Sequence, residues 1–467
     1  MRQERAYIRS ILVGLLVSAI AAPMAACQPA PADLPPETAE AELAADAVPV
    51  AWEPPVEIAS GDAYRGPWRM NESVFDFVDD PTVAMNDAGY VGVAWADHPQ
   101  QDIFFQLYGP DNEPRLDEPV NVSRSPGIFS WLPRMVVTDG NEPDVYLLWQ
   151  DIVFYPESSH GGEIIFARST DGGSSFDAPI NLSDTVAGAG KGRLTARRWH
   201  NGSFDIAVGP DGGIYAAWTE YEGALWFSRS IDGGGEFSEP QRLAGAEGEN
   251  PARGPSIAVD HEGAVYIAWT IGEDGAADIR YAVSRDGGES FGEPRVVHES
   301  EGHSDAPKLA FDPGGTLHLA YAESPTGPFA AYHILYARMD ADNGAFEEPS
   351  ALPAADGGDA WSGFPSLSVD GAGAVYLLWE HYPAPRDRPQ GLAFAVSRDG
   401  GDSFTRPVVA PGSAEPEGAF NGSQQGLLMR KLAVNTGGAL AVVNSTFKSN
   451  ESSHIWLIRG ALETGEE

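Results

Sequence analysis

A short turn pattern occurs four times along this chain, and its recurrence constrains the fold more than any other feature. Each copy reads Ser-x-Asp-x-Gly-x-x-Phe, and the copies span residues 169–176, 230–237, 284–291 and 397–404. In this pattern the Ser and Asp side chains can form hydrogen bonds across a turn, and Gly can adopt a positive φ. The Phe can anchor the next strand in the core. Four copies predict a structure built from repeated hairpins.

Each turn belongs to a larger unit of four short strands. A first apolar strand, a Gly-rich turn and a second strand precede the pattern, and a Pro-x-x-apolar strand follows it. The first strands recur at Pro81, Pro133, Phe204, Pro255, Pro307, Pro365 and Arg430. The second strands end at Trp95, Trp149, Trp218, Trp269, Tyr321, Trp379 and Asn444. Degenerate turns at 340–346 and 111–116 complete the series, so we count seven units.

The seventh unit lacks its fourth strand, and a candidate replacement lies before the first unit. No Pro-x-x-apolar strand follows residues 454–459, but residues 55–58 read Pro-Val-Glu-Ile. Seven four-stranded sheets would therefore close through an N-terminal strand into an all-β propeller, which leaves only short protected edges. One miscounted divergent unit would make six blades instead. We expect residues 51–467 to form this single domain.

The repeated turns resemble the Asp-boxes, or bacterial neuraminidase repeats, of sialidase-like propellers. The resemblance covers nearly the whole chain after residue 53. It implies that the turn lies between the third and fourth strands of a blade, remote from the active site, and acts as a structural staple. Because the same turn occurs in enzymes and in non-catalytic propellers, fold alone does not fix function. The aspartates of the staple are Asp171, Asp232, Asp286 and Asp399.

The N-terminus reads as an export signal that ends at a lone cysteine. Residues 1–26 place three arginines before an apolar run too short to span a bilayer. Met24-Ala-Ala-Cys27 is similar to the lipobox of bacterial lipoproteins, and Cys27 is the only cysteine in the chain. We expect lipidation at Cys27, a semi-extended Ala/Pro/Glu-rich tether over residues 27–50, and a location in the cell envelope. By analogy with lipoprotein sorting, Gln28 favours the outer membrane.

The chain is strongly acidic. Its formal net charge is −39, with 68 acidic residues against 29 Lys and Arg. This balance argues against a nucleic-acid partner, because phosphate contacts need clustered positive charge. We find no spaced Asp loop or His/Cys cluster typical of a metal site and expect no metal or other cofactor. We expect a monomer that contacts the membrane only through its lipid.

A propeller usually binds ligands at its axis, on the face made by the loops that lead into the first strands. Cations, amides and aromatic side chains recur there although cations are scarce overall. Such groups suit a polar, anionic, sugar-like ligand. The alternative is that each cation pairs with a neighbouring carboxylate and holds a loop in place. The candidate ligand-binding residues are Arg134, Arg198, His200, Asn201, Arg253, His303, Lys308, Trp361, Gln425 and Arg430.

The resemblance to sialidases implies further requirements if the chain is an enzyme. Sialidases bind the substrate carboxylate with three arginines and use a Tyr paired with Glu as nucleophile, plus an Asp acid/base. The Phe/Tyr-Arg-Ile-Pro motif expected ahead of the propeller strands is absent from this sequence. The catalytic residues therefore stay unassigned, and the candidates are Asp305, Tyr382 and Glu380.

These observations favour a lipid-anchored, cell-envelope propeller that binds a glycan or another polar ligand at its axial face. Two alternatives stay open. The chain could be an exo-glycosidase of sialidase type, with three arginines and a Tyr–Glu pair in one axial pocket. It could instead be a protein-interaction scaffold, with no deep pocket and a large exposed apolar patch.

Overall fold

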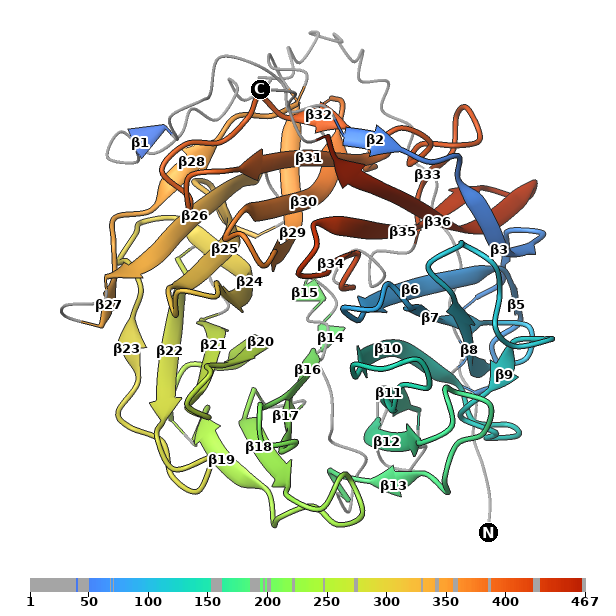
Figure 1. The fold of residues 1–467 in the computed structure, drawn as a ribbon, viewed down its shortest axis with the longest axis horizontal. Helices are drawn as coiled ribbons and strands as arrows, with labels where there is room; N and C mark the ends of the chain where they lie inside the picture. Colours follow the sequence, from blue (N-terminus) through green and yellow to red (C-terminus); the bar gives the residue numbers. More distant parts are fainter. Residues whose placement is uncertain are drawn as a thin grey trace, which may run out of the picture. The chain divides into compact units, whose positions relative to one another are not determined.

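The structure is a computed structural model that describes most of the chain after residue 49. The described residues are 39–40, 50–67, 69, 71–152, 162–184, 194–195, 198–199, 203–220, 223–246, 248–272, 276–328, 331–340, 344–355, 360–384, 388–422 and 429–463. Within these ranges the chain forms strands, turns and bends, and no helix that could cross a membrane is found there. Seven four-stranded blades stand in a ring (Figure 1). The predicted seven-bladed propeller is confirmed.

Each of the first four blades is a plain antiparallel sheet of four consecutive strands. The first blade contains β6 (Val78–Met85), β7 (Val91–Asp97), β8 (Asp102–Tyr108) and β9 (Val120–Asn121). The second contains β10 (Ser130–Val137), β11 (Val145–Asp151), β12 (Glu163–Ser169) and β13 (Ile180–Asn181). The third contains β16 (Phe204–Val208), β17 (Ile214–Thr219), β18 (Leu225–Ser230) and β19 (Gln241–Ala244). The fourth contains β20 (Ala252–Val259), β21 (Val265–Ile271), β22 (Asp278–Ser284) and β23 (Arg295–Val296).

The fifth and sixth blades keep this plan. The fifth contains β24 (His303–Phe311), β25 (Leu317–Ser324), β26 (His333–Asp340) and β28 (Ser350–Leu352), with β27 (Ala345–Phe346) paired to β26. The short β1 (Ala39–Glu40) runs parallel to β28 at the outer edge of this blade. The sixth blade contains β29 (Trp361–Val369), β30 (Val375–Tyr382), β31 (Leu392–Ser397) and β32 (Val408–Val409).

The seventh blade is completed by a strand from the N-terminal side of the propeller, as predicted. It contains β34 (Leu432–Val434), β35 (Ala439–Lys448) and β36 (Ser452–Leu462), with β33 (Phe420–Asn421) beside β35. The fourth strand is β3 (Val56–Gly61), which pairs antiparallel with β36 so that Val56 faces Leu457. The neighbouring β2 (Val50–Trp52) extends this contact to Leu462. Closing the ring in this way leaves β36 with a partner on each side.

The second strands supply the bulk of the apolar core. Their sequences are apolar at almost every position because these strands pack against a neighbouring blade on both faces. The tryptophans at their ends are at most 2% exposed. They therefore act as core residues, and a role in sugar stacking is excluded for them. These residues are Trp95, Trp149, Trp218, Trp269 and Trp379.

The four repeated turns share one hydrogen-bond pattern at the junction of the third and fourth strands. In the last copy, Ser397 Oγ donates to Asp399 Oδ1 at 2.6 Å and accepts from the Gly401 amide at 2.8 Å. Asp399 also accepts from the backbone and side chain of Ser403. Gly400 and Gly401 have φ values of 70° and 96°, which side chains with a Cβ rarely adopt.

The Phe of each turn joins its blade to the preceding one. Phe404 is 1% exposed and packs edge-on against Tyr336 of the fifth blade, with ring centroids 4.8 Å apart. The pairs Phe105–Phe176, Phe166–Phe237 and Phe227–Phe291 repeat this contact at 4.8–5.6 Å between the earlier blades. The turns therefore stabilise both their own hairpin and the junction between blades.

Candidate functional site

The inner strands share a bulge close to the axis of the ring. In five blades the residue before the strand's proline has φ between 52° and 65°. The pairing register with the second strand shifts at the same place. Such bulges re-aim the side chains that follow. The five residues are Asp80, Leu132, Gly254, Ala306 and Phe364.

In each blade one polar residue lies at the inner-strand position that directly follows the bulge in the five bulged blades, and several of these residues bond a neighbouring inner strand. Ser256 Oγ accepts from the Leu309 amide at 3.1 Å, and Ser366 Oγ accepts from the Lys431 amide at the same distance. Asp205 Oδ2 accepts from the Ile257 amide at 3.0 Å. These residues share one position of the inner strands, which lie on the inside of the ring (Figure 1), and all of them except Lys308 are buried. We call them the axial ring: Thr82, Arg134, Asp205, Ser256, Lys308, Ser366 and Lys431.

An ion pair crosses the axis at this level. Arg430, at the start of the seventh blade's inner strand, places Nη2 2.7 Å from Oδ1 of Asp205 in the third blade. These blades are not neighbours, so the bond joins two blades across the ring. Arg134 of the second blade also reaches inward, donating to Met429 Sδ and lying 5.5 Å from the centroid of Phe204. The structure thus brings Arg134 and Arg430, both predicted ligand-binding residues, close to Asp205.

Lys308 of the fifth blade completes a group of three cations at the axis. Burial, together with the charges of Arg134 and Arg430, lowers its pKa to about 7, while Asp205 and Asp305 oppose the shift. Among the described residues no hydrogen bond or ion pair engages its ammonium group. The Lys308 residue as a whole is half-buried. An ammonium beside two guanidinium groups is a ready binding site for an anion.

Arg253, His303 and Asp305 contact one another beside this group. Arg253 Nη2 lies 2.7 Å from His303 Nε2, and its Nε lies 3.3 Å from Asp305 Oδ1. Arg253 also donates to the Gly272 carbonyl. His303 is 1% exposed, so its ring contacts protein groups and has no open face toward the axis. This cluster fixes the loops that lead into the fourth and fifth blades.

Glu380 lies in a fully buried network between the sixth and seventh blades. Its Oε1 is 2.5 Å from Lys431 Nζ, and its Oε2 accepts from the Asn421 amide. Asn444 in turn accepts from Lys431 and donates to Asn421 at 3.0 Å. Burial raises the pKa of Glu380, although Lys431 and Asn421 act in the opposite direction. Both carboxylate oxygens are thus occupied by protein donors.

Tyr382 lies near Glu380 but is not primed to lose a proton. Burial raises the pKa of its phenol well above 10, and the charge of Glu380 raises it further. Its ring lies 6.5 Å from that of Trp361, which is half-buried at the start of β29. A tyrosine nucleophile needs a base that takes its proton, and Glu380 is already engaged by Lys431 and Asn421.

Four of the sequence-predicted residues cannot be placed in this site. The backbone of Arg198 lies in β15 (Arg198–Trp199), which pairs with β14 (Leu194–Thr195). The structure does not describe the Arg198 side chain. His200, Asn201 and Gln425 lie outside the described residues, as does Cys27. In the described part of the chain, no group of three or more His, Cys, Asp or Glu side chains is arranged as metal ligands.

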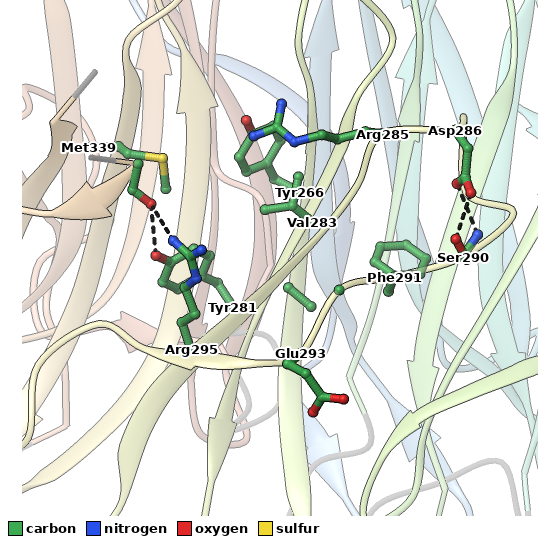
Figure 2. Close-up of a pocket in the computed structure, with 13 residues that line it drawn as sticks. Tyr266, Tyr281, Val283, Arg285, Asp286, Ser290, Phe291, Glu293, Arg295 and Met339 are labelled. Atoms are coloured by element: carbon green, nitrogen blue, oxygen red, sulfur yellow. Dashed lines mark hydrogen bonds between the residues drawn. The ribbon is translucent and has the colours of Figure 1, made fainter. Parts of the chain in front are cut away.

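A groove of about 790 Å³ lies at the rim of the ring, away from the predicted face (Figure 2). Its walls come from the repeated turn of the fourth blade, including Asp286 and Phe291, and from the fifth blade. The fifth blade has the degenerate turn here, and its Gly344 carbonyl accepts from Tyr281 Oη at 3.0 Å and from Arg295 at 3.2 Å. The turns lie at the opposite strand ends from the loops that lead into the inner strands, so this groove is separate from the axial ring.

Two features of the site escaped sequence analysis. Asp205 was not singled out, although it occupies the same register position as Arg134 and Lys308 once the inner strands are aligned. Arg65 and Arg388, which lie near each other on the face of the loops leading into the inner strands, were also missed. Lys and Arg are scarce in this acidic chain, so each arginine in a loop could have been examined as a candidate ligand-binding residue.

Comparisons with known proteins show what the chain is similar to. No family model and no curated protein matches it. Among solved structures, an ulvan lyase of polysaccharide lyase family PL25 bound to -[GlcA(1-4)Rha3S]- has a TM-score of 0.53 and 11% identity, covering 86% of this chain and 96% of its own. The polysaccharide lyase Uly1 has a TM-score of 0.50 and 12% identity, covering 88% and 100%. At such identities the likeness shows the fold alone.

A sialidase is also found among the similar structures. The Trypanosoma rangeli sialidase in complex with sialic acid has a TM-score of 0.42 and 14% identity, covering 76% of this chain and 60% of its own.

Proposed function

We propose that this chain is a cell-envelope propeller that binds an acidic glycan at its axial face. The observation that carries the proposal is the convergence of Arg134, Lys308 and Arg430 on the axis of a chain whose net charge is −39. Two of these cations interact with Asp205, but Lys308 has no partner among the described residues. A carboxylate or sulfate of a glycan would supply one.

The similar structures add limited support. The ulvan lyase of the same fold is bound to a glycan whose repeat includes GlcA and Rha3S, so this architecture can hold an acidic polysaccharide. Lipidation at Cys27 and a location at the outer membrane remain part of the proposal, and they rest on the lipobox-like sequence. A Cys27→Ala variant should then be released from the membrane fraction.

The geometry favours binding over sialidase-type hydrolysis. Glu380 is fully buried with both oxygens engaged, and Tyr382 has a strongly raised phenol pKa. A scaffold role has little support either, because the exposed large apolar side chains in the described ranges are Tyr64, Val74, Ile231 and Val408, which form no large patch.

Binding of the full chain to an array of acidic and neutral glycans tests the proposal. We expect acidic glycans to be retained and neutral ones of equal length to bind at least tenfold more weakly. Lys308→Met should reduce retention of the acidic glycans. Equal binding of neutral glycans would contradict the proposal, and turnover of any bound glycan would replace binding with an enzymatic function.

A further inference from the structure

A second cavity, of about 190 Å³, lies on the same face as the loops that lead into the inner strands. Four parts of the chain enclose it. The β4 (Tyr64–Arg65) and β5 (Phe75–Asp76) hairpin forms one wall, and the tip of the β35–β36 hairpin forms another. Arg388 and the strand β33 complete it. Figure 1 shows β5, β33 and β36 on the same side of the ring.

The floor of this cavity is aromatic. Phe420 lies 5.4 Å from Phe447, and Phe447 lies 5.4 Å from Phe77 with the two rings nearly perpendicular. Phe77 and Phe447 are buried, whereas Phe420 is half-buried. An apolar floor of this kind suits the flat, C–H-rich face of a ring-shaped ligand.

Two arginines stand at the rim of the cavity. The guanidinium of Arg388 lies 4.1 Å from the centroid of Phe420, and that of Arg65 lies 5.8 Å from the centroid of Phe75. An arginine stacked on a ring keeps its N–H donors in the guanidinium plane, where they can bind an oxyanion bidentately. Both guanidinium groups are therefore positioned to bind without first being released from a carboxylate.

The cavity carries no compensating negative charge in its described lining. No Asp or Glu lines it, although acidic residues outnumber Lys and Arg by 68 to 29 in the whole chain. Within the described residues neither Arg65 nor Arg388 forms an ion pair. Burial lowers the pKa of Arg388, and the charge of Arg65 lowers it further, so the two like charges act on each other. A bound anion would relieve this repulsion.

The walls are held by backbone hydrogen bonds and need little rearrangement to bind. The Asn450 amide donates to the Ala63 carbonyl at 3.2 Å, which ties the β35–β36 tip to the hairpin carrying Arg65. The Asn421 amide donates to the Pro389 carbonyl at 2.7 Å, which fixes the loop carrying Arg388. Preorganised groups lose less conformational entropy when a ligand binds.

We propose that this cavity binds one acidic sugar residue, with its carboxylate between Arg65 and Arg388 and its ring against the edges of Phe420 and Phe447, because the guanidinium of Arg388 covers one face of Phe420. The Asn450 side chain at the cavity's edge is placed to contact a hydroxyl group. This inference rests on the proposed function, because it adds a second subsite for an acidic glycan on the same face as the axial ring.

Calorimetric titration of the full chain with glucuronic acid, and with glucose as its neutral counterpart, tests the site. We expect glucuronic acid to bind at least tenfold more tightly than glucose. Arg388→Gln and Arg65→Gln should each weaken glucuronic acid binding at least tenfold. The control Arg406→Gln removes the same charge from an exposed arginine in the turn of the sixth blade and should leave binding unchanged.

A further variant separates loss of binding from loss of folding. Asn450→Asp keeps the size of the side chain and suits the φ of 56° at this position, but it adds a repulsive carboxylate. It should weaken glucuronic acid binding without lowering the melting temperature. Wild-type binding by Arg388→Gln, Arg65→Gln and Asn450→Asp would overturn the proposal, as would equal binding of glucose.

The outcome also distinguishes this subsite from the axial ring. Lys308→Met could abolish binding of an acidic oligosaccharide while Arg388→Gln binds it normally. This result would support the axial binding site and contradict the second subsite. Arg388→Gln could instead abolish glucuronic acid binding while Lys308→Met binds the oligosaccharide normally. This result would support the second subsite and contradict the axial proposal.

Discussion

Burial of Lys308 beside Arg134 and Arg430 disfavours its charged form, so protonation should control the axial site near neutral pH. With a pKa of about 7, most of the ammonium is protonated at pH 6 and little of it at pH 8. If only the protonated form binds an anion, the affinity should fall about tenfold between these pH values. Titration of the full chain with an acidic oligosaccharide at both pH values measures this change.

Lys308→Arg is the control for this pH dependence. Arginine stays protonated at pH 8, so the variant should bind equally at pH 6 and 8. Asp205, Asp305, Arg134 and Arg430 are the charged groups that act on Lys308 in the folded chain. A variant that keeps the tenfold change would show that another group controls binding.

Lys308 should also lower the free energy of unfolding of the chain. Its pKa is 10.5 when unperturbed and about 7 in the folded chain, so the unfolded chain binds more protons between these values. The destabilisation therefore grows as the pH falls from 10.5 to 7 and is constant below that. Lys308→Met should raise the free energy of unfolding at pH 7 by about 1 kcal/mol, since water screens part of the cost. A urea midpoint unchanged from wild type would contradict this expectation.

At the scale of elements, the turns were predictable because all of their determinants are local. Ser, Asp, two glycines and Phe within eight residues define both the hydrogen bonds and the positive φ values. The sequence did not indicate which surface the Phe would meet. That surface is the third strand of the preceding blade, and the contact depends on how blades pack.

Phe404→Ala tests the contact between blades. The ring is 1% exposed and packs on Tyr336, so its loss leaves a cavity at the junction of the fifth and sixth blades. We expect a destabilisation of about 3–5 kcal/mol. Ile231→Ala is the matched control, because Ile231 occupies a repeated turn but is 80% exposed, and it should change stability by less than about 0.5 kcal/mol. Chemical denaturation of both variants gives the comparison.

The closing strand makes the ring depend on a short N-terminal segment. β3 and β2 cover one edge of β36, and an uncovered strand edge promotes aggregation. A chain lacking residues 1–61 should therefore aggregate or lose its sharp thermal transition. A chain lacking only residues 1–49 keeps both strands and should melt close to the full chain. Addition of a peptide of residues 50–62 should restore the transition to the shorter chain.

At the scale of the whole molecule, the sequence predicted several of the cations that lie close together but not the contacts between them. Arg134 and Lys308 could be predicted because they occupy a repeating position in the inner strands, and Arg430 directly precedes that position. The Arg430–Asp205 pair could not, because it joins two blades that are distant in sequence and not adjacent in the ring. The second cavity was missed for a similar reason, since Arg65 and Arg388 belong to separate insertions that only the closed ring brings together.

The charge of the whole chain should make its stability depend on salt. A net charge of −39 on a compact domain repels itself, and raising the ionic strength from about 0.01 M to about 1 M shortens the screening length from about 30 Å to about 3 Å. The melting temperature at pH 7 should therefore rise with NaCl. The sequence pI is about 4.4, so at that pH the repulsion is nearly absent and the same salt should have little effect. An equal salt effect at both pH values would show that specific ion binding or a general solvent effect stabilises the ring, and that net repulsion is minor.

Acidic glycans must approach the protein against this repulsion between like charges. Their binding should therefore first improve as salt screens the whole surface, and then weaken as salt screens the axial cations.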